Sequence, residues 1–483
     1  MMRHRVDGVV VVLLLLATAV RFPTLGARSL WFDEALSGLI ARLSTTQVLS
    51  NAAGSSHPPG YYFVLHLWRP LGESEFALRF PSAWCSLAAV ALVARLGRDL
   101  SGQRTARLAA LGMALSPFQI YYAQETRMYG LTIALSAGVL WAFLRGACEN
   151  NRKAWCAYGV LTGLGLYVHY YIALAVLALH LWLFLDRGRA RRVGVSVAVA
   201  DSLAAVAFLP QVTQLLTEAG ESLRGLTSWQ PRPTLLSPLT TLYYLLFGHV
   251  LPLGWVGIGL FLTLAVTALA GLALARQDRG AVVWPITLVV IVPLLLILAL
   301  SFIAHSIYLE RSFAVATPAL MLLLAWAVAN APRRSPAPYL GAALAALMAV
   351  GAVLYHLRPD PAKPPLHEAV EVVAEGAETE DIRLHLQDAS YLPALYYESE
   401  RAGALVDVGQ RLWLAPEVYT LFGGRVVTAA TLPTSGRVWL TVMPGYVGPA
   451  QAELLARWDA AHAPLETWDW ETVQTRLYAL EGE

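Results

Sequence analysis

Residues 9–20 read VVVVLLLLATAV, a run of twelve apolar or small residues, and residues 29–37 read SLWFDEALS. The first stretch is apolar enough to form most of a membrane-spanning helix. The second places two adjacent carboxylates, Asp33 and Glu34, shortly after that helix. A carboxylate beside hydrocarbon is costly unless it has a partner, a substrate or water. This junction therefore indicates both a membrane fold and a candidate site.

Composition agrees with a membrane protein. The 483 residues are 57% hydrophobic and 14% charged, with a mean hydropathy of +0.53, which is outside the range of ordinary soluble domains. The formal net charge of +2 is too small to indicate nucleic acid or a strongly acidic partner. Cys85, Cys148 and Cys156 form no CxxC pair, so we expect neither a disulfide framework nor a zinc finger.

Eleven segments are apolar and long enough to span a membrane, at about residues 8–22, 81–97, 107–121, 129–146, 155–170, 171–186, 194–211, 254–274, 282–302, 314–331 and 338–356. With the N-terminus inside, because of Arg3 and Arg5, every one of the five inside loops carries at least two basic residues. This pattern predicts a multi-pass protein of the plasma (inner) membrane with a cytoplasmic N-terminus. A cleaved signal peptide is the alternative for the first segment, and we favour its retention as a helix.

Three long segments lie on the predicted outer face: about residues 22–80, about residues 212–253, and everything after about residue 357. We expect a transmembrane catalytic module over residues 1–357 and a small soluble α/β domain over residues 358–483. In that domain, residues 381–387, 403–408, 424–430 and 436–443 have the pattern of strands, and residues 367–377 and 449–462 that of helices. It has no glycine-rich phosphate loop or metal-ligand spacing, which favours a structural or acceptor-recognition role over a second active site.

Polar clusters recur in the outer segments, and each has an ordinary explanation as well. Asp33 and Glu34 could cap an amphipathic helix over residues 33–49. Glu125 and Arg127 could simply pair with each other in the very short turn at residues 124–127. An interfacial turn explains the prolines and tyrosines of SSHPPGYYFVLHLW but not its histidine, His57. Two further turns, at residues 167–171 and 305–311, carry similar side chains.

The location of these residues on one membrane face is the main signal for function. Acids, histidines, arginines and tyrosines come to this face from loops that are remote in sequence. A carboxylate can take a proton from an acceptor hydroxyl, arginine can hold a phosphate as it leaves, and aromatic rings can pack on sugars or isoprenoid chains. Together these residue types indicate group transfer from a lipid phosphate.

The same residues resemble the GT-C integral-membrane glycosyltransferases, in the branch of the dolichyl-phosphate-mannose protein mannosyltransferases and the lipid A aminoarabinose transferase (glycosyltransferase family 39-like). The matching pieces, which extend over about residues 1–356, are SLWFDEA, HPPGYYFVLHLW, SEFALRFPS, SPFQIYYAQETRMYGL, HYYIAL and LERSFAVATPAL. The resemblance implies a one-step inverting transfer from a polyprenyl-phosphate sugar to an acceptor hydroxyl on the outer face. It also implies that the donor, a protein, lipid or glycan acceptor, and membrane lipids are the partners.

The resemblance implies roles for nine residues. Asp33 matches the family's catalytic acid and would be the general base, while Glu125, or less well Glu34, would position the acceptor or support Asp33. Arg127 and Arg311 would bind the lipid phosphate with His57 nearby. The predicted residues lining the site are Tyr61, Tyr129 and His169.

Two departures from the family pattern bear on the donor and on a metal. His57-Pro58-Pro59 stands where the aminoarabinose transferases have a charged residue followed by lysine and proline. Arg311-Ser312-Phe313 stands where relatives often have Arg-Tyr-Leu. No separate acid is required, because phosphate is already a good leaving group, and we expect no required cofactor. A divalent cation near His57 stays open, although one histidine without a second ligand is more often a hydrogen-bonding residue.

Two other classes compete with a transferase. A lipid or sugar transporter or flippase would place polar groups near the bilayer midplane, where His180 and Asp201 are the only candidates that we would name. A membrane sensor would account for residues 360–483 but not for the polar turns of several membrane loops. We therefore favour an inverting glycosyltransferase.

Overall fold

The computed structural model of the chain describes residues 7–218, 230–277, 281–303, 306–332, 334–358, 363–399, 401–409 and 412–481. Its contacts divide the chain into two compact units. The first consists of residues 1–23, 56–61 and 80–358, and the second of residues 24–55, 62–79 and 359–483. The predicted boundary lay near residue 357, with the whole first outer loop in the membrane module. In the structure most of that loop groups instead with the C-terminal residues.

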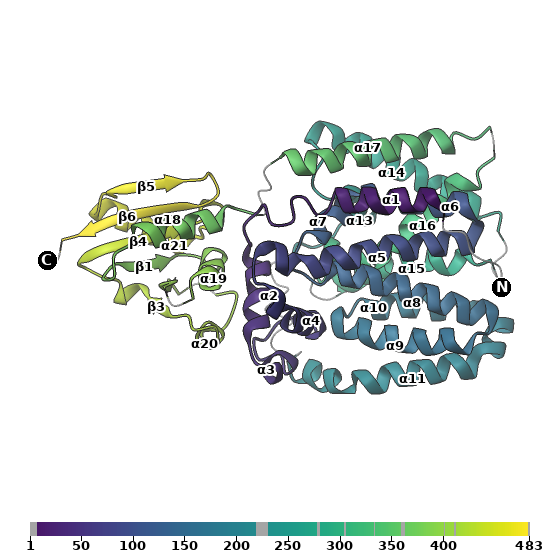
Figure 1. The fold of residues 1–483 in the computed structure, drawn as a ribbon, viewed down its shortest axis with the longest axis horizontal. Helices are drawn as coiled ribbons and strands as arrows, with labels where there is room; N and C mark the ends of the chain where they lie inside the picture. The colour runs from purple at the N-terminus through teal and green to yellow at the C-terminus, as the bar shows by residue number, and fades with distance from the viewer. Residues whose placement is uncertain are drawn as a thin grey trace. The chain divides into compact units, whose positions relative to one another are not determined.

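The first unit is a bundle of helices (Figure 1). Its elements are α1 (Gly8–Ala19), α5 (Glu75–Ser101, of which the first turn belongs to the second unit), α6 (Gln103–Leu115), α7 (Pro117–Ala123), α8 (Tyr129–Glu149), α9 (Arg152–Val168), α10 (Ile172–Leu185), α11 (Arg187–Glu218), α13 (Ser237–Phe247), α14 (Leu253–Leu274), α15 (Val283–Ile303), η2 (Glu310–Ala316), α16 (Thr317–Ala329) and α17 (Ala337–Leu357). Each of the eleven predicted spans overlaps helices in this set. Within the described residues, seven helical segments are long and apolar enough to cross a membrane, and α1 and α10 are shorter apolar helices.

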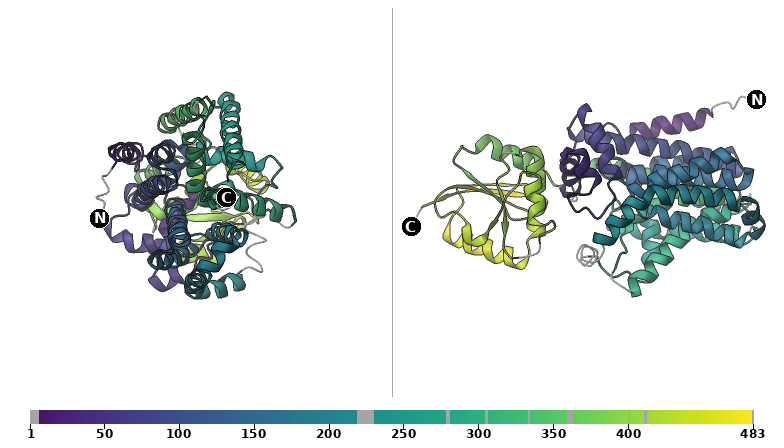
Figure 2. Two further views of the ribbon diagram at one scale, coloured as in Figure 1. Left: turned by 90° about the vertical axis from the view of Figure 1, so that its right-hand side faces the viewer. Right: turned by 90° about the horizontal axis from the view of Figure 1, so that it is seen from below.

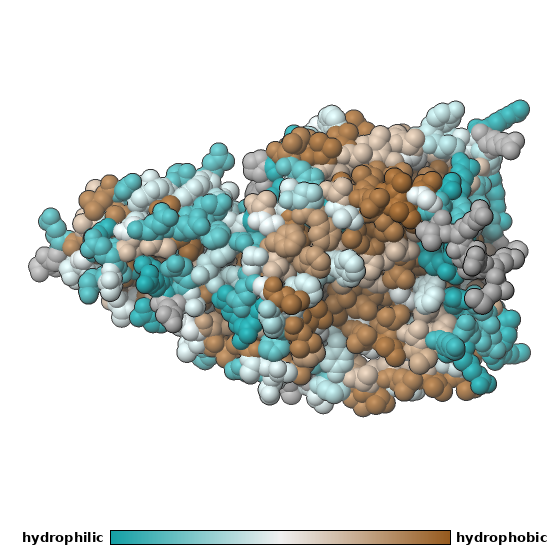
Figure 3. Space-filling model, in the orientation of Figure 1, coloured by the Kyte–Doolittle hydropathy of each residue, from teal (hydrophilic) through white to brown (hydrophobic). Residues whose placement is uncertain are grey.

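The surface of this bundle is apolar. Figure 3 shows hydrophobic side chains gathered over its helices. Among them are Leu15, Leu203, Phe261, Leu264 and Leu295, each more than half exposed. A soluble protein rarely exposes so large an apolar surface, whereas lipid tails cover it at no cost. The chain is therefore a polytopic membrane protein, as predicted. Arg3 and Arg5, on which the predicted orientation depends, lie outside the described residues.

Local sequence explains where several helices begin and end. Asp7 caps α1 by accepting the Val9 N–H at 3.0 Å. Asn150, at φ 52°, ends α8, and the side chain of Asn151 then caps α9. The predicted span at residues 107–121 is wrong as a single helix, because it breaks at Ser116 into α6 and α7. Pro117 disfavours helical geometry for the residue before it, and the Ser116 side chain caps the new helix.

The second unit contains a six-stranded sheet in the order β3-β2-β1-β4-β6-β5. The first four strands of this order run parallel, and β6 and β5 add antiparallel to β4 and to each other. The bounds are β1 (Ile382–His385), β2 (Ala404–Asp407), β3 (Val426–Thr428), β4 (Gly436–Val442), β5 (Glu466–Asp469), β6 (Gln474–Leu480), α18 (Leu366–Gly376), α19 (Asp388–Tyr397), α20 (Pro416–Leu421), η3 (Ala429–Thr431), η4 (Pro444–Tyr446) and α21 (Pro449–Ala461). The predicted α/β domain is confirmed, and all six of its predicted elements are present. The sequence did not predict α19, α20, β5 and β6.

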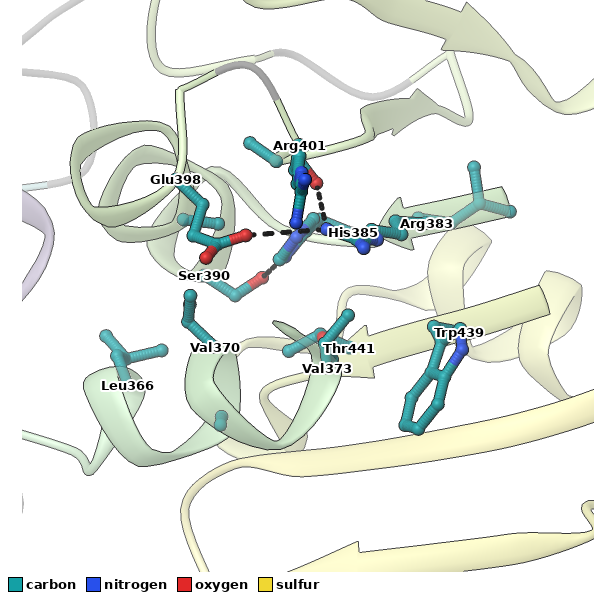
Figure 4. Close-up of a pocket in the computed structure, with 14 residues that line it drawn as sticks. Leu366, Val370, Val373, Arg383, His385, Ser390, Glu398, Arg401, Trp439 and Thr441 are labelled. Carbon is teal, nitrogen blue, oxygen red and sulfur yellow. Dashed lines mark hydrogen bonds and ion pairs between the residues drawn. The ribbon is translucent and has the colours of Figure 1, made fainter. Parts of the chain in front are cut away.

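Helices cover both faces of this sheet (Figure 2). On one face, Leu384, Leu440 and Val442 pack with Leu454 and Trp458 of α21. On the other face, α18 and α19 enclose a cavity beside β1 and β4, which is lined in part by Arg383, His385, Ser390, Glu398 and Trp439 (Figure 4). Its volume of about 20 Å³ is the space of about one water molecule. The cavity is therefore far smaller than a pocket for a sugar or nucleotide.

The first outer loop adds short helices to the second unit: α2 (Phe32–Arg42), α3 (Thr45–Leu49), α4 (Gly60–Trp68, of which residues 62–68 belong here) and η1 (Arg69–Leu71). The single helix predicted over residues 33–49 is broken between α2 and α3. Ser44 and Gln47 form a capping box at the break, and this satisfies the backbone N–H groups of a new helix start. Helix α2 is buried over most of its length, from Glu34 to Ala41.

Candidate active site

Two histidines from separate turns come together in the first unit. The ring of His57 lies 5.7 Å from that of His169, which follows α9, and the ring of Tyr129 lies 6.0 Å from that of His169. Gly60 makes this approach possible, because a Cβ at that position would lie only 2.5 Å from the carbonyl oxygen of Tyr167. The rigid His57-Pro58-Pro59 turn therefore rests against the end of α9 because residue 60 has no side chain.

The turn between α7 and α8, residues 124–128, is buried and anchored at its start. All five of its side chains are at most 3% exposed. The Gln124 side chain donates to the Arg21 carbonyl at 2.7 Å and accepts from the Tyr355 hydroxyl at 2.9 Å. The Arg21 guanidinium is itself buried and donates to the Met113 and Ala114 carbonyls, at the end of α6. Arg21 was not predicted as part of the site, because its only signal in the sequence is its place directly after the apolar run of residues 9–20.

A second chain of hydrogen bonds holds the other end of this turn. The Ser82 hydroxyl donates to the Arg127 carbonyl at 3.0 Å, and the Tyr61 hydroxyl bonds that serine at 2.9 Å. Tyr61, predicted to line the site, is 1% exposed. A Cβ on Gly130 would lie 2.6 Å from the Ser82 carbonyl oxygen, so α5 and α8 cross closely here. The backbone around Arg127 is thus fixed by its neighbours.

The electrostatics of the two histidines place both arginines near them. Burial, followed by the charge of Arg127, lowers the pKa of His57 well below its ordinary value, and Arg311 contributes in the same direction. Burial and the same two arginines lower the pKa of His169 to about 4. Both imidazoles are therefore neutral near pH 7. Arg127 and Arg311, remote in sequence, act on one place, as their predicted roles require.

A row of tyrosines continues from the histidines. The rings of Tyr122 and Tyr129 are 4.6 Å apart, and the Tyr122 hydroxyl lies 2.7 Å from that of Tyr244 on α13. The charges of Glu125 and Arg311 reach both Tyr122 and Tyr244. Tyr244 comes from the second outer segment and carries no motif, so the sequence analysis missed it. Glu125 thus lies close enough to the hydroxyls of Tyr122 and Tyr244 for its charge to act on both.

The segment before Arg311 is tied to helix α13 and to the turn before α10. The Tyr308 hydroxyl bonds Thr241 at 2.7 Å, and the Tyr171 hydroxyl donates to the Ile307 carbonyl at 2.9 Å. These contacts fix the start of η2, which carries Arg311. His305, in the predicted turn at residues 305–311, lies outside the described residues.

Asp33 and Glu34 belong to the second unit, in the first turn of α2. The N-cap of α2 is Trp31, and no side chain caps it. Neither carboxylate is therefore the N-cap that the ordinary explanation required. Glu34 is fully buried, and both of its oxygens lie 2.8 Å from nitrogens of Arg79. Lys363, in the segment before α18, lies 3.4 Å from Glu34.

Arg79 explains how the segment in front of α2 is held. Besides Glu34, it donates to the carbonyls of Leu25, Arg28 and Ser29 at 2.8–3.0 Å. Its side chain is 1% exposed. Arg79 lies in SEFALRFPS, one of the pieces that resemble the family. The sequence therefore indicated this motif but not that Arg79 pairs with Glu34. Glu34 has two cationic partners, and its predicted role beside Asp33 remains a prediction.

The two midplane candidates have ordinary partners, and no metal cluster is found among the described residues. Within the described residues, no group of three or more His, Cys, Asp or Glu side chains could hold a metal ion. His180 and Asp201, the predicted midplane candidates, bond each other at 2.8 Å. The other His180 nitrogen bonds the Val176 carbonyl, and the other Asp201 oxygen accepts from Tyr158. Both groups are thus satisfied by the helices around them.

Comparisons with known proteins agree on the fold. Residues 56–213 match the family model described as dolichyl-phosphate-mannose-protein mannosyltransferase, and no curated protein sequence matches the chain. The crystal structure of ArnT from Cupriavidus metallidurans bound to undecaprenyl phosphate matches with a TM-score of 0.67 at 15% identity, over 97% of this chain and 98% of that one. The Archaeoglobus fulgidus oligosaccharyltransferase, in complex with Zn and sulfate, matches with a TM-score of 0.54 at 13% identity, over 98% of this chain and 73% of that one. The chain is therefore a polytopic membrane protein with the GT-C fold, as its outer-face motifs predict.

Proposed function

We propose that this protein is an inverting glycosyltransferase that moves a sugar from a polyprenyl-phosphate donor to an acceptor hydroxyl on the extracytoplasmic face of the plasma (inner) membrane. The observation that carries the proposal is the convergence of Arg127 and Arg311 on the neutral pair His57 and His169. The match to an ArnT structure with bound undecaprenyl phosphate supports the choice of a lipid-phosphate donor.

The charges of the site suit a phosphodiester. Arg127 and Arg311 contribute two formal positive charges and Glu125 one negative charge, so these three groups sum to +1. A sugar phosphodiester carries one negative charge, and guanidinium groups bind phosphate oxygens with paired hydrogen bonds. The neutral histidines can add hydrogen bonds without adding charge. The site thus favours the phosphate while leaving Glu125 to orient the hydroxyls of a sugar or acceptor.

The transfer itself is a single displacement. The acceptor oxygen attacks the anomeric carbon from the face opposite the phosphate, and the bond between that carbon and the phosphate oxygen breaks. The electron pair of that bond leaves with polyprenyl phosphate, whose growing negative charge the two arginines stabilise. Asp33 takes the proton of the acceptor hydroxyl. Because attack and departure occur on opposite faces, the anomeric configuration inverts.

Metal is not part of this proposal. Phosphate leaves as a stable anion between two arginines, so the step needs no Lewis acid. We expect transfer to proceed at the same rate with excess EDTA as with added Mg²⁺ or Mn²⁺. A loss of turnover in EDTA that either ion restores would show that His57 contributes to a metal site.

The acceptor is a hydroxyl of a protein, a lipid or a glycan, and we place its recognition in the outer segments. We propose residues 217–238 as the loop that selects the acceptor, of which positions 219–229 lie outside the described residues. Residues 230–236 lead into α13, which carries Tyr244. Loops generally vary in sequence among related proteins, whereas the helices hold the site in place. For this reason we assign the choice of acceptor to this segment.

The first experiment is glycosyl transfer by the purified protein in lipid, with a panel of polyprenyl-phosphate sugars. Asp33→Asn should abolish turnover while donor still binds, because it removes the base and keeps the size of the side chain. Asp99→Asn, at the exposed Arg95–Asp99 pair of α5, is the matched control and should keep wild-type turnover. Donor binding without turnover by the wild type, with every acceptor class supplied, would favour a lipid transporter. Full turnover by Asp33→Asn would refute the base assignment.

A further inference from the structure

The C-terminal domain contacts the segment that carries Asp33 through the end of one helix. Tyr396 and Tyr397 are the last two residues of α19, and this helix packs on α2. Both helices belong to the second unit. The sequence predicted only a structural or acceptor-recognition role for this domain, so a direct hold on α2 is a new feature.

The Tyr397 hydroxyl holds the residue three positions before Asp33. It accepts the Leu30 N–H at 2.8 Å and donates to the Glu75 carboxylate at 2.8 Å. His367 of α18 stacks flat on the Tyr397 ring, with centroids 4.2 Å apart, and its Nδ1 lies 3.1 Å from the same carboxylate. Glu75 and the His367 ring thus hold the Tyr397 side chain in place, and its hydroxyl accepts the Leu30 N–H just before α2 begins.

Tyr396 holds the middle of α2. A Cβ on Gly38 would lie 2.5 Å from the Tyr396 ring, so the ring rests directly on the helix backbone. The Tyr396 hydroxyl donates to the Glu73 carbonyl at 2.7 Å. Arg42, at the end of α2, donates to the Tyr396 carbonyl at 2.8 Å and lies 4.1 Å above its ring. Only glycine at position 38 permits this contact.

A third contact lies between these two. Lys363, from the segment that leads into the domain, lies 3.4 Å from Glu34, the neighbour of Asp33. The C-terminal residues therefore contact α2 and its approach at Leu30, Glu34 and Gly38. Asp33 lies inside this span, and a shift of about 1 Å in a reacting group can cost on the order of a hundredfold in rate.

We propose that α19 of the C-terminal domain sets the position of Asp33, with Tyr397 as a positioning residue for the transfer reaction. The effect on the transfer reaction rests on the proposed function, whereas the hold of α19 on α2 does not. Tyr397 acts through the backbone at Leu30, and Tyr396 and Lys363 complete the hold. Removal of one hydroxyl should loosen α2 without unfolding the domain.

The test compares two tyrosines of the same helix in the full-length protein. Tyr397→Phe removes the hydroxyl on Leu30. Tyr391→Phe is the matched control, because that hydroxyl also accepts one backbone N–H, from Arg425, and donates to one oxygen, the Gly403 carbonyl, both inside the domain. In hydrogen exchange, peptides over residues 29–42 should exchange about tenfold faster in Tyr397→Phe and at the wild-type rate in Tyr391→Phe. Equal rates in the two variants would overturn the inference.

Kinetics give the second readout. With a polyprenyl-phosphate sugar from the panel, Tyr397→Phe should lower kcat about tenfold and leave the donor KM within about twofold, because the donor still binds but the base is displaced. A kcat equal to that of Tyr391→Phe would overturn the positioning role. If the wild type transfers no sugar, the proposed function fails, and the exchange comparison by itself then decides whether α19 holds α2.

Discussion

Replacing Arg79 by methionine should release the segment in front of Asp33. Methionine keeps much of the length of the side chain and loses every donor. Removing one partner of a buried ion pair costs about 3–5 kcal/mol. We expect the lower end, about 3 kcal/mol, because Lys363 stays 3.4 Å from Glu34 and keeps part of the charge balance. The three carbonyls that Arg79 bonds all lie within residues 25–29, so the loss falls mainly on that segment.

Native-state trypsin digestion measures this loss where it occurs. Cleavage after Arg28 in the full-length protein reports how often this segment opens, provided that reclosing is faster than cleavage. A cost of about 3 kcal/mol corresponds to roughly a hundredfold faster cleavage. Arg95→Met on the same helix is the control, because its Arg95–Asp99 pair is 37% exposed on both sides. An exposed pair of this kind is worth at most about 1 kcal/mol, so we expect a change of less than about fivefold.

A rate for Arg79→Met within about tenfold of the control would refute the reasoning, because it would mean that the buried pair does not hold the segment. Glu34→Gln adds a discriminating case. We expect it to be cleaved much faster than the wild type, since it leaves Arg79 and Lys363 buried without a carboxylate. If Glu34→Gln instead resists trypsin like the wild type but has no turnover, Glu34 takes part in the reaction itself.

Three further predictions concern the first unit. Arg311→Ala should raise the apparent constant for donor at least tenfold more than that for acceptor, and equal changes in steady-state kinetics would contradict a phosphate role. The His169 pKa is about 4 when folded and near 6.5 when unfolded, so its contribution to stability is complete above pH 6.5 and falls by roughly 3 kcal/mol as the pH drops toward 4. Thermal midpoints in detergent should therefore fall less between pH 7.5 and 4.5 for His169→Gln than for wild type, and parallel curves would contradict the shift. Gly60→Ala should cost about 1–3 kcal/mol of stability because of the Tyr167 carbonyl, whereas Gly257→Ala, with no atom within 4 Å of its Cβ, should not lower the thermal midpoint.

The amino-acid sequence determined most of the membrane segments, four of the six strands of the C-terminal domain and the residues that we propose for the site. Long apolar runs such as residues 9–20 specify spanning helices, because the hydrocarbon core accepts little else. Short β-branched runs such as residues 436–443 specify buried strands. The polar residues of the outer turns are conspicuous against this background. For that reason His57, Glu125, Arg127 and Arg311 could be named from their surroundings alone.

Sequence patterns failed to predict three features of the fold whose local structure does not follow the hydrophobic pattern. The break at Ser116 was missed because residues 107–121 are mostly apolar. Pro117 ends the first helix by disfavouring helical geometry at Ser116, and this effect does not change the apolar pattern. Strand β5 was missed because its side chains are mostly exposed, so it lacks the apolar run of a core strand. Helix α19 was missed because it contains Pro393, and proline is disfavoured inside helices, although its side chains from Asp388 to Tyr396 are buried.

Only the tertiary structure decided which residues meet. Glu34 of α2 forms an ion pair with Arg79 of α5. The Leu30 N–H donates to the hydroxyl of Tyr397, which lies near the other end of the chain. Contacts between residues that are remote in sequence depend on the packing of whole elements. No local sequence pattern therefore identifies the partner of either residue. The sequence could therefore nominate a carboxylate pair after the first helix. The fold decided that Glu34 is neutralised by Arg79 and Lys363, and that the C-terminal domain holds the helix on which Asp33 lies.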